Sequence, residues 1–315
     1  MQFINSLKVG DRINSIYFCK SKNSCLTKAG KPFEALNMQD KTGIIDAKIW
    51  DPNSAGIDDF DAMDYVDISG EITEFNGALQ MNIQRARKVS IDDINPGDYM
   101  PTSERGTDEM LGELKGFINE VSNEDYKKIL THFFGDSSEY IAAFKKHSAA
   151  KTVHHSFIGG LLEHTVSVTK NCEFFCTNYP FLKKDLLLTA AMLHDIGKLR
   201  EIDAFPVNDY SDEGNLIGHI VVGVEMIDDA VREIGTVNKT AVLELKHCIV
   251  SHHGELEYGS PKKPALAEAI ALSFADNIDA KLETIKEALA PVADDSLEWQ
   301  KRNFFLDTII RRTSK

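Results

Sequence analysis

The chain has 315 residues, 43% of them hydrophobic and 27% charged, and a formal net charge of −14. The acidic balance argues against a passive nucleic-acid-binding protein, which is usually basic, but it is compatible with an enzyme whose metal ions neutralise phosphate locally. The length favours two domains over one core, and no apolar run approaches the roughly 18 residues of a membrane-spanning helix, so we expect no membrane association.

Residues 1–95 are rich in short runs that alternate between hydrophobic and polar side chains. Such alternation predicts β-strands with one buried face, and Asn76-Gly77 predicts a tight hairpin turn between the last two strands. Five strands are enough for a small Greek-key barrel, and a polar loop should follow the first of them. The expected strands cover residues 12–18, 33–38, 44–50, 65–75 and 79–83.

Residues 31–50 resemble the second and third strands of OB-fold, anticodon-binding-like domains. The resemblance implies binding of single-stranded nucleic acid through basic residues and stacked aromatic rings. An excess of eight Lys or Arg over four Asp or Glu within the first fifty residues agrees with that role. The two aromatic residues could instead fill the barrel core. The candidate binding residues on this hairpin are Lys31, Phe33, Lys48 and Trp50.

The pattern changes from strand to helix across residues 90–102, a segment that contains two prolines. Regular structure tolerates such a segment poorly, so we place a domain boundary there. We expect an OB-fold domain over residues 1–95, a linker with lead-in helices over 96–150 and a helical domain over 151–315. The fold class is therefore a multi-domain α+β protein in which a β-barrel precedes an all-α core.

The helical part contains an apolar run, residues 186–193, that leads into the sequence Leu-His-Asp-Ile-Gly-Lys. The run predicts a buried helix, and Gly197 is placed to end it in a left-handed conformation. His194 and Asp195 would then lie at a buried helix end, where charge is costly unless something pairs with it. A loop or short hairpin is expected over residues 200–218. Further helices are expected over residues 110–121, 126–133, 157–168, 219–234, 240–251 and 269–280.

Histidine is concentrated in this helical part, with eight of the ten histidines between positions 154 and 253. A single histidine on an apolar helix is usually a core residue with satisfied hydrogen bonds. Several histidines and aspartates that face one interior would be costly without a cation to organise them. The pattern therefore predicts a metal site formed by His164, His194, Asp195, His219, His252, His253 and Asp276.

The order His164…His194-Asp195…Asp276 resembles the H…HD…D signature of the HD-domain metal-dependent phosphohydrolase superfamily. The resemblance implies an all-helical core in which these four residues hold one metal ion. The later histidines resemble the extra ligands of two-metal members. An OB domain before such a core resembles, more narrowly, the YhaM family of 3′–5′ exoribonucleases. That resemblance implies hydrolysis of single-stranded RNA, or of single-stranded DNA, to 5′-nucleoside monophosphates.

The expected ligands combine imidazole and carboxylate groups, which suit Mn, Co, Fe or Zn better than an all-oxygen Mg site, with Mn as the first expectation. One ion would take the four signature residues. A second would take His219 and either His252 or His253, with Asp195 as the bridge between the two ions. Lys198 is expected to hold a substrate phosphate. Its alternative role is that of a lysine facing the carboxyl end of a helix.

Three ionisable residues beside these ligands are expected to have lesser roles. His154 and His155 precede the helix of His164, and we expect surface positions for both, with substrate contact as the alternative. Asp279 lies one helical turn after Asp276, so it either supports the site from behind or lies at the surface.

The sequence leaves two other functions open. An HD enzyme could act on small cyclic or triphosphate nucleotides, in which case it should ignore polymers. A non-enzymatic protein that binds single-stranded nucleic acid would retain its function without His194 and Asp195.

The cysteines and the first residues of the chain indicate the cellular compartment. Five cysteines are an odd number, and no C-x-x-C pair occurs among them, which favours free thiols. The first residues lack the basic region and apolar stretch of a secretory signal. Both features predict a cytoplasmic protein, with no prediction of its oligomeric state.

Overall fold

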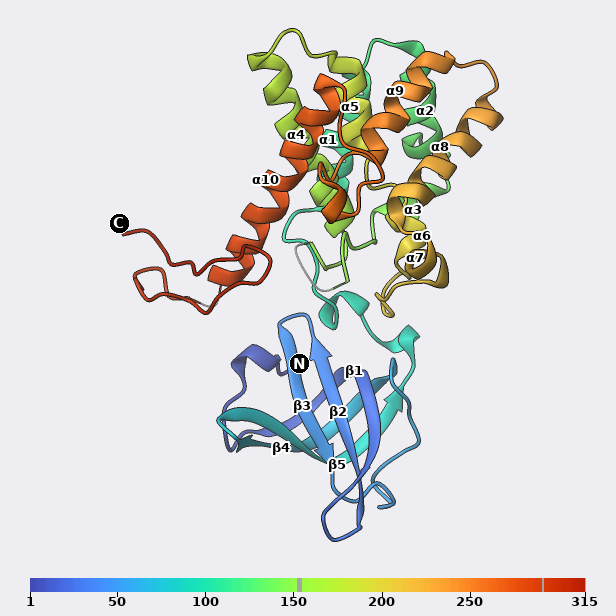
Figure 1. The fold of residues 1–315 in the computed structure, drawn as a ribbon. Coiled ribbons are helices and arrows are strands. Elements are labelled where there is room, and N and C mark those ends of the chain that lie inside the picture. Colours follow the sequence, from blue (N-terminus) through green and yellow to red (C-terminus); the bar gives the residue numbers. More distant parts are fainter. Residues whose placement is uncertain (152–154, 291, 315) are drawn as a thin grey trace. The chain divides into compact units, whose positions relative to one another are not determined.

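The computed structural model describes residues 1–151, 155–290 and 292–314, which form two compact units (Figure 1). The first unit ends at Thr102 and the second begins at Ser103. Each unit has its own cluster of buried hydrophobic residues. The helices between residues 107 and 144, which the sequence predicted as part of a lead-in segment, contribute side chains to the core of the second unit.

The first unit is a closed five-stranded β-barrel, which confirms the predicted OB-type barrel. Its strands follow the order β1-β2-β3-β5-β4, and β1 pairs with β4 to close the barrel. The β3–β5 pair is parallel, whereas the other neighbours are antiparallel. The strands are β1 (Arg12–Leu26), β2 (Pro32–Asp40), β3 (Gly43–Ile49), β4 (Tyr65–Phe75) and β5 (Ala78–Val89).

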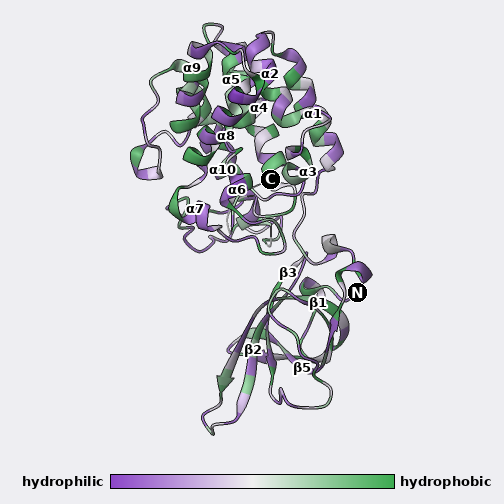
Figure 2. Ribbon diagram, turned by 90° about the vertical axis from the view of Figure 1, so that its right-hand side faces the viewer, coloured by the Kyte–Doolittle hydropathy of each residue, from purple (hydrophilic) through white to green (hydrophobic). Residues whose placement is uncertain are grey.

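Hydrophobic and hydrophilic residues are interleaved along the ribbons of both units (Figure 2). In β3 the alternation has the period of two that a barrel wall requires, because successive side chains point to opposite faces. Ile45, Ala47 and Ile49 are buried in the barrel, and Asp46 and Lys48 face outward.

Strand β1 is longer than predicted, because the polar residues that follow position 18 are strand and not loop. After a bulge between Cys19 and Ser21, β1 continues to pair with β2 until Leu26 lies opposite Pro32. None of residues 20–26 is buried. A strand with neither face covered shows no hydrophobic alternation, so the sequence pattern missed this extension.

The second unit is built from helices, and in this it confirms the predicted all-α core. The segment expected as a loop or hairpin, residues 200–218, contains one short helix and a β-bridge between Ile202 and Tyr210. The helices are α1 (Thr107–Glu120), α2 (Glu124–Phe134), α3 (Tyr140–Phe144), α4 (Gly160–Asn178), α5 (Lys184–Leu193), α6 (Lys198–Glu201), α7 (Asp212–Leu216), α8 (His219–Ile234), α9 (Lys239–Val250) and α10 (Ala267–Leu289).

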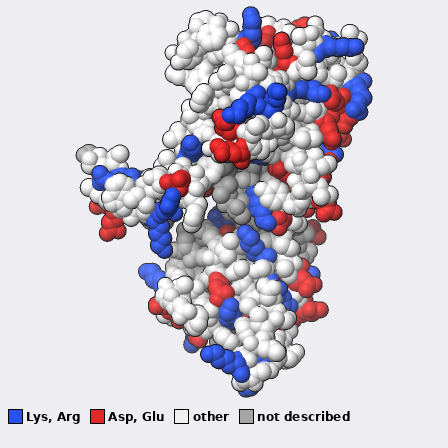
Figure 3. Space-filling view, viewed as in Figure 1, with Lys and Arg blue, Asp and Glu red and all other residues white. Residues whose placement is uncertain are grey.

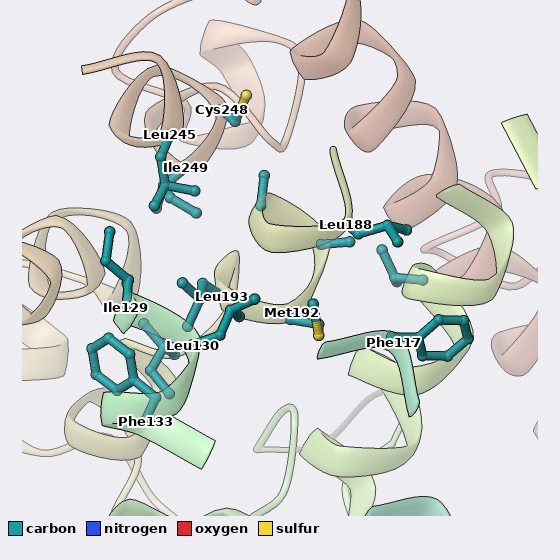
Figure 4. Packing of buried hydrophobic residues seen from close by; sticks show 14 of the residues in the cluster. Phe117, Ile129, Leu130, Phe133, Leu188, Met192, Leu193, Leu245, Cys248 and Ile249 are labelled. Carbon is teal, nitrogen blue, oxygen red and sulfur yellow. The ribbon is translucent and has the colours of Figure 1, made fainter. Parts of the chain in front are cut away.

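Helix α5 is buried on all sides, which explains why its sequence has no polar face. Every residue of α5 from Leu186 to Leu193 is buried. The helix packs against α1, α2, α4, α9 and α10. Figure 4 shows Leu188, Met192 and Leu193 of α5 among side chains of these neighbours. The turn that follows α5 is therefore held in place by the centre of the core.

Gly197 does not end α5 in a left-handed conformation, contrary to the prediction. Its φ of −64° and ψ of −19° are right-handed helical values. The position instead requires the absence of a side chain, because a Cβ atom there would lie 2.0 Å from the carbonyl oxygen of His219 and 2.6 Å from the nitrogen of Gly223. The turn after α5 thus lies directly against the first turns of α8.

Within the described ranges, no helix combines the length and the apolar character needed to cross a membrane. All five cysteines are free thiols, as predicted, and Cys19, Cys172 and Cys248 are buried.

Because α5 lies at the centre of the core, we expect substitutions of its buried residues to destabilise the helical unit. Leu187 is fully buried, so Leu187→Ala should lower the free energy of unfolding of this unit by about 2–5 kcal/mol through lost transfer energy and a residual cavity. The measurement is urea unfolding followed by circular dichroism at a helix-specific wavelength. Leu243→Ala on α9 is the control, since Leu243 is 67% exposed and its loss should have little effect. Equal losses at both positions would contradict the packing described above.

Candidate metal centre

The seven residues predicted as metal ligands meet at one place in the helical unit. His164 lies in α4, and Asp276 lies in α10. His219 is the first residue of α8, and the pair His252-His253 follows the end of α9. The pair His194-Asp195 forms the turn between α5 and α6. Segments separated by more than one hundred residues therefore supply one set of side chains.

One group of side chains gathers around the Oδ2 oxygen of Asp195. The Nε2 atoms of His164 and His194 lie 3.4 and 3.3 Å from this oxygen and 3.1 Å from each other. Oδ1 of Asp276 lies 3.2 Å from Nε2 of His164 and 3.9 Å from Nε2 of His194. The ligand atoms of His164, His194 and Asp276 all lie within 4.8 Å of one another, which is close enough to share one metal ion.

A second group gathers around the other oxygen, Oδ1, of Asp195. Nε2 of His219 lies 3.6 Å from Oδ1, and Nε2 of His252 lies 3.7 Å from it. His253 completes this group, because its ligand atom lies within 4.8 Å of those of His219 and His252. The sequence left open which of the two adjacent histidines faces the site, and both do.

The histidines direct their Nε2 atoms at the site because their Nδ1 atoms bind elsewhere. Nδ1 of His194 donates to the carbonyl oxygen of Ala191, at 2.8 Å, and Nδ1 of His252 donates to that of Ile249, at 2.7 Å. Both acceptors lie in the last turn of a helix, where carbonyl groups lack helical partners. Nδ1 of His253 donates likewise to the carbonyl oxygen of Tyr258. A proton fixed on Nδ1 leaves the Nε2 lone pair for a ligand bond.

Asp195 lies between the two groups of side chains, and its carboxylate is almost fully buried. The side chain is 2% exposed. Oδ2 of Asp195 forms an ion pair with Lys198, whereas Oδ1 of Asp195 and Nε2 of His219 and of His252 have no hydrogen-bond partner among the described residues. Buried polar atoms without partners are costly, so their convergence requires an explanation. Imidazole nitrogens and carboxylate oxygens in this pattern fit divalent metal ions.

The pKa shifts at the site are consistent with a bound cation. Burial alone would raise the pKa of Asp195, but Lys198, His194 and His164 outweigh it and hold this pKa well below its usual range. For His164, burial is outweighed by Asp195 and other carboxylates, so its pKa is raised well above its usual value. Burial and neighbouring histidines lower the pKa of His252, which keeps that imidazole neutral. Positive charge is therefore stabilised next to the carboxylates.

Lys198 lies inside the site, at the start of α6, with its side chain 12% exposed. Its Nζ is 2.7 Å from Oδ2 of Asp195. Burial lowers the pKa of Lys198, but the charge of Asp195 outweighs this effect and raises it, so the ammonium group stays charged. The geometry therefore does not support the alternative of a lysine at the carboxyl end of a helix.

Two carboxylates that the sequence did not assign hold ligand histidines in place. Glu201 accepts 2.8 and 2.9 Å hydrogen bonds from Nδ1 and the backbone nitrogen of His219. Oδ2 of Asp279 accepts a 2.7 Å hydrogen bond from Nδ1 of His164. Of the two positions that the sequence left open for Asp279, behind the site or at the surface, the structure therefore shows the one behind the site. Glu201 follows the Leu-His-Asp-Ile-Gly-Lys sequence by three residues, but nothing in its type or spacing marked it.

The expected surface position of His155 is wrong. His155 is 2% exposed, and its Nε2 lies 2.9 Å from Oδ2 of Asp279, which also receives a hydrogen bond from Ser167 through its other oxygen. Asp279 is thus held from two sides while it orients His164. The other histidine expected at the surface, His154, lies outside the described residues.

The four nucleic-acid-binding candidates lie on the outside of the barrel. The rings of Phe33 and Trp50 are stacked at 5.2 Å with an interplanar angle of 29°, and Trp50 is 53% exposed. Neither ring belongs to the barrel core, so the core-filling alternative is wrong. Lys31 is exposed, whereas Nζ of Lys48 pairs with Asp46 at 2.8 Å. Lys and Arg residues are interspersed with Asp and Glu on the face drawn in Figure 3.

Comparisons with known proteins show what this chain is similar to. The family model of the HD domain matches residues 161–281. The 3′–5′ exoribonuclease YhaM of Bacillus subtilis is 34% identical over 301 residues, which are 95% of this chain and 94% of that protein. The protein of the same name from Listeria innocua is 33% identical with the same coverage. The second OB-fold domain of replication protein A from Methanococcus maripaludis, a solved structure, covers 28% of this chain at 18% identity, with a TM-score of 0.22 and 94% of that chain covered.

The contact between Asp279 and His164 makes a prediction about metal affinity. Asp279→Asn replaces the carboxylate that holds the proton on Nδ1 of His164 by a neutral amide. The affinity of the protein for Mn²⁺ should therefore fall about 10- to 100-fold. Isothermal titration with Mn²⁺ measures this change without reference to turnover. Asp136→Asn is the matched control, because Asp136 is 93% exposed and distant in sequence from the ligands. An unchanged affinity in Asp279→Asn would contradict the supporting role.

Proposed function

The chain belongs to the YhaM family of 3′–5′ exoribonucleases, and on that premise we propose that it degrades single-stranded RNA to 5′-nucleoside monophosphates at a centre for two metal ions. The observation that carries the two-ion proposal is the division of ligand atoms around Asp195, with one group facing each oxygen. Single-stranded DNA is a further expected substrate, because phosphodiester hydrolysis does not require a 2′-hydroxyl group.

The proposed first ion is held by His164, His194, Asp195 and Asp276, and the second by Asp195, His219, His252 and His253. Mixed nitrogen and oxygen ligands favour Mn²⁺, with Co²⁺, Fe²⁺ and Zn²⁺ as alternatives. When bound, such ions activate water near neutral pH and neutralise phosphate oxygens during in-line displacement.

The residues of the chain have distinct proposed roles around this centre. Asp195 belongs to both ligand groups, so its removal should disrupt both. Lys198 carries a charge that is held beside Asp195, and we assign it to a non-bridging oxygen of the substrate phosphate. Asp279 and Glu201 keep the protons of His164 and His219 on Nδ1, which prevents either imidazole from turning away.

The barrel supplies the proposed contact with the polynucleotide. The stacked rings of Phe33 and Trp50 offer an exposed aromatic surface, and every nucleobase has a π-face that can stack on it. Lys31 and Lys48 lie on the same hairpin, and Lys31 is free to approach the backbone phosphates. The free thiols favour a cytoplasmic location, where RNA is available.

Digestion of a 5′-labelled single-stranded RNA in the presence of Mn²⁺ tests the proposed activity. We expect a ladder that shortens steadily from the 3′ end and releases 5′-mononucleotides. Asp195→Ala should abolish the ladder, since it removes an oxygen donor from both ligand groups. Intact RNA with turnover of cyclic or free nucleotides would move the substrate to small nucleotides. Substantial residual activity of Asp195→Ala would contradict the bridging role.

The stacked pair on the barrel makes a separate prediction about RNA binding. Phe33→Ala should raise the dissociation constant for a long single-stranded RNA by about tenfold, within the range of 1–3 kcal/mol per stacked base. Fluorescence anisotropy measures this binding. Hydrolysis of bis-p-nitrophenyl phosphate, which carries no base, is followed in parallel. Phe181→Ala is the control, as this ring is 69% exposed and lies in the helical unit. Equal losses in RNA binding and in hydrolysis of the small ester would contradict a separate binding surface.

A further inference from the structure

A pocket of about 810 Å³ opens beside the second group of ligands. His253 lines this pocket and also belongs to the ligand group with His219 and His252. The pocket lies between the segment that follows α9 and one face of α10, the long red helix in Figure 1. Its volume falls within the range of about 300–1,000 Å³ that is typical of small-molecule sites. The wall of the pocket is thus continuous with the metal centre.

The walls of this pocket are aromatic and apolar. Phe274 and Tyr258 both line it, and they are 62% and 59% exposed. Ile278 and Leu282 follow Phe274 at intervals of four along α10, so they extend the same face of the helix. Large apolar side chains that remain exposed in a concave site are typical of a ligand-binding surface.

The segment after α9 contributes residues both to the pocket and to the second group of ligands. The carbonyl oxygen of Tyr258 accepts the 2.8 Å hydrogen bond from Nδ1 of His253. Gly254, at a φ of +81°, brings this segment close to α10, where an added Cβ would meet Ser273 at 3.5 Å. The residue that fixes the orientation of His253 therefore also contributes its ring to the pocket.

Polar groups complete the pocket with donors suited to a nucleotide. Asn277 directly follows the metal-ligand candidate Asp276, and its side-chain amide makes no hydrogen bond with any residue in the described parts of the chain. Lys281, one turn later, forms no ion pair with those residues, whereas Lys263 pairs with Glu255 at 2.6 Å. An amide presents both a donor and an acceptor, which suits the edge of a base, and ammonium groups suit phosphates.

We propose that this pocket binds the base and ribose of the nucleotide next to the scissile phosphate, with the base stacked on Phe274 and Tyr258. The proposal rests on the proposed function, because a phosphate held at the metal centre places its own nucleoside within reach of an adjoining pocket. Stacking on an aromatic ring accepts any base, so the pocket supports digestion without sequence preference. Lys281, which forms no ion pair with the described residues, and the shared His253 favour a nucleotide over a second copy of the chain as the occupant.

The test compares two phosphates that differ only by a base. Isothermal titration measures the affinities of the Mn²⁺-loaded protein for adenosine 5′-monophosphate and for ribose 5-phosphate. Both present a phosphate to the metal centre, so their ratio isolates the pocket. The wild-type protein should bind adenosine 5′-monophosphate about 5- to 150-fold more tightly, the range given by 1–3 kcal/mol of stacking. Phe274→Ala should bring the ratio close to one, and Phe274→Trp should restore it.

Control variants separate the outcomes. Phe174→Ala removes an aromatic ring that is 64% exposed on α4, and it should keep the wild-type ratio. A ratio near one in the wild-type protein, or an unchanged ratio in Phe274→Ala, would overturn the proposal. A lower molar mass of Phe274→Ala by light scattering would also overturn it, because the face would then be an interface between copies. Failure of the proposed function would give a different result. RNA would then stay intact in the digestion, while the titration would still show tighter binding of adenosine 5′-monophosphate than of ribose 5-phosphate.

Discussion

The helical unit depends on the compensation of one buried carboxylate, that of Asp195. A carboxylate removed from water carries a penalty of several kcal/mol, even after the surroundings relax. Lys198 offsets part of this cost through a 2.7 Å ion pair with Oδ2, whereas Oδ1 faces the Nε2 atoms of His219 and His252, which have no hydrogen-bond partner among the described residues. Imidazole lone pairs and a carboxylate oxygen repel one another, so this side of Asp195 favours additional positive charge. The proposed metal ions would therefore stabilise the fold as well as supply the chemistry.

The apolar core supplies the precision that this centre needs. Helix α5 is buried on all sides, so the turn that carries His194 and Asp195 cannot shift without disturbing its neighbours. The ends of α5 and α9 contribute in a second way, because the carbonyl groups of Ala191 and Ile249 in their last turns fix the proton position on His194 and His252. The same helix ends thus place the ligand residues and set their protonation.

The sequence predicted the cluster of candidate ligands, because histidine and aspartate have few other roles in apolar helices. It did not predict the residues whose roles depend on how the folded chain surrounds them. His164, His194, Asp195 and Asp276 could be found because histidine and aspartate rarely occupy apolar helices without a partner. Glu201 and His155 could not, because charged residues in polar segments are common, and only the folded chain shows that both are buried. Gly197 misled for a similar reason, since a glycine can serve a left-handed turn or a close helix contact. The sequence did not predict the extension of β1 after Cys19, because a strand that is exposed on both faces shows no alternation of hydrophobic and polar residues.

The ligand residues span the chain from His164 to Asp276, with supports that extend to Asp279, and this separation links the metal to the folding equilibrium. Only a segment that extends from α4 to α10 contains both groups of ligands, so the full set comes together only when these two helices are docked. Any partial opening that releases α10 removes Asp276 and Asp279 at once. By mass action, each ion that binds the closed unit suppresses such openings. If the proposed centre binds its ions, metal supply would thus affect the lifetime of the folded protein against proteolysis as well as its turnover of substrate.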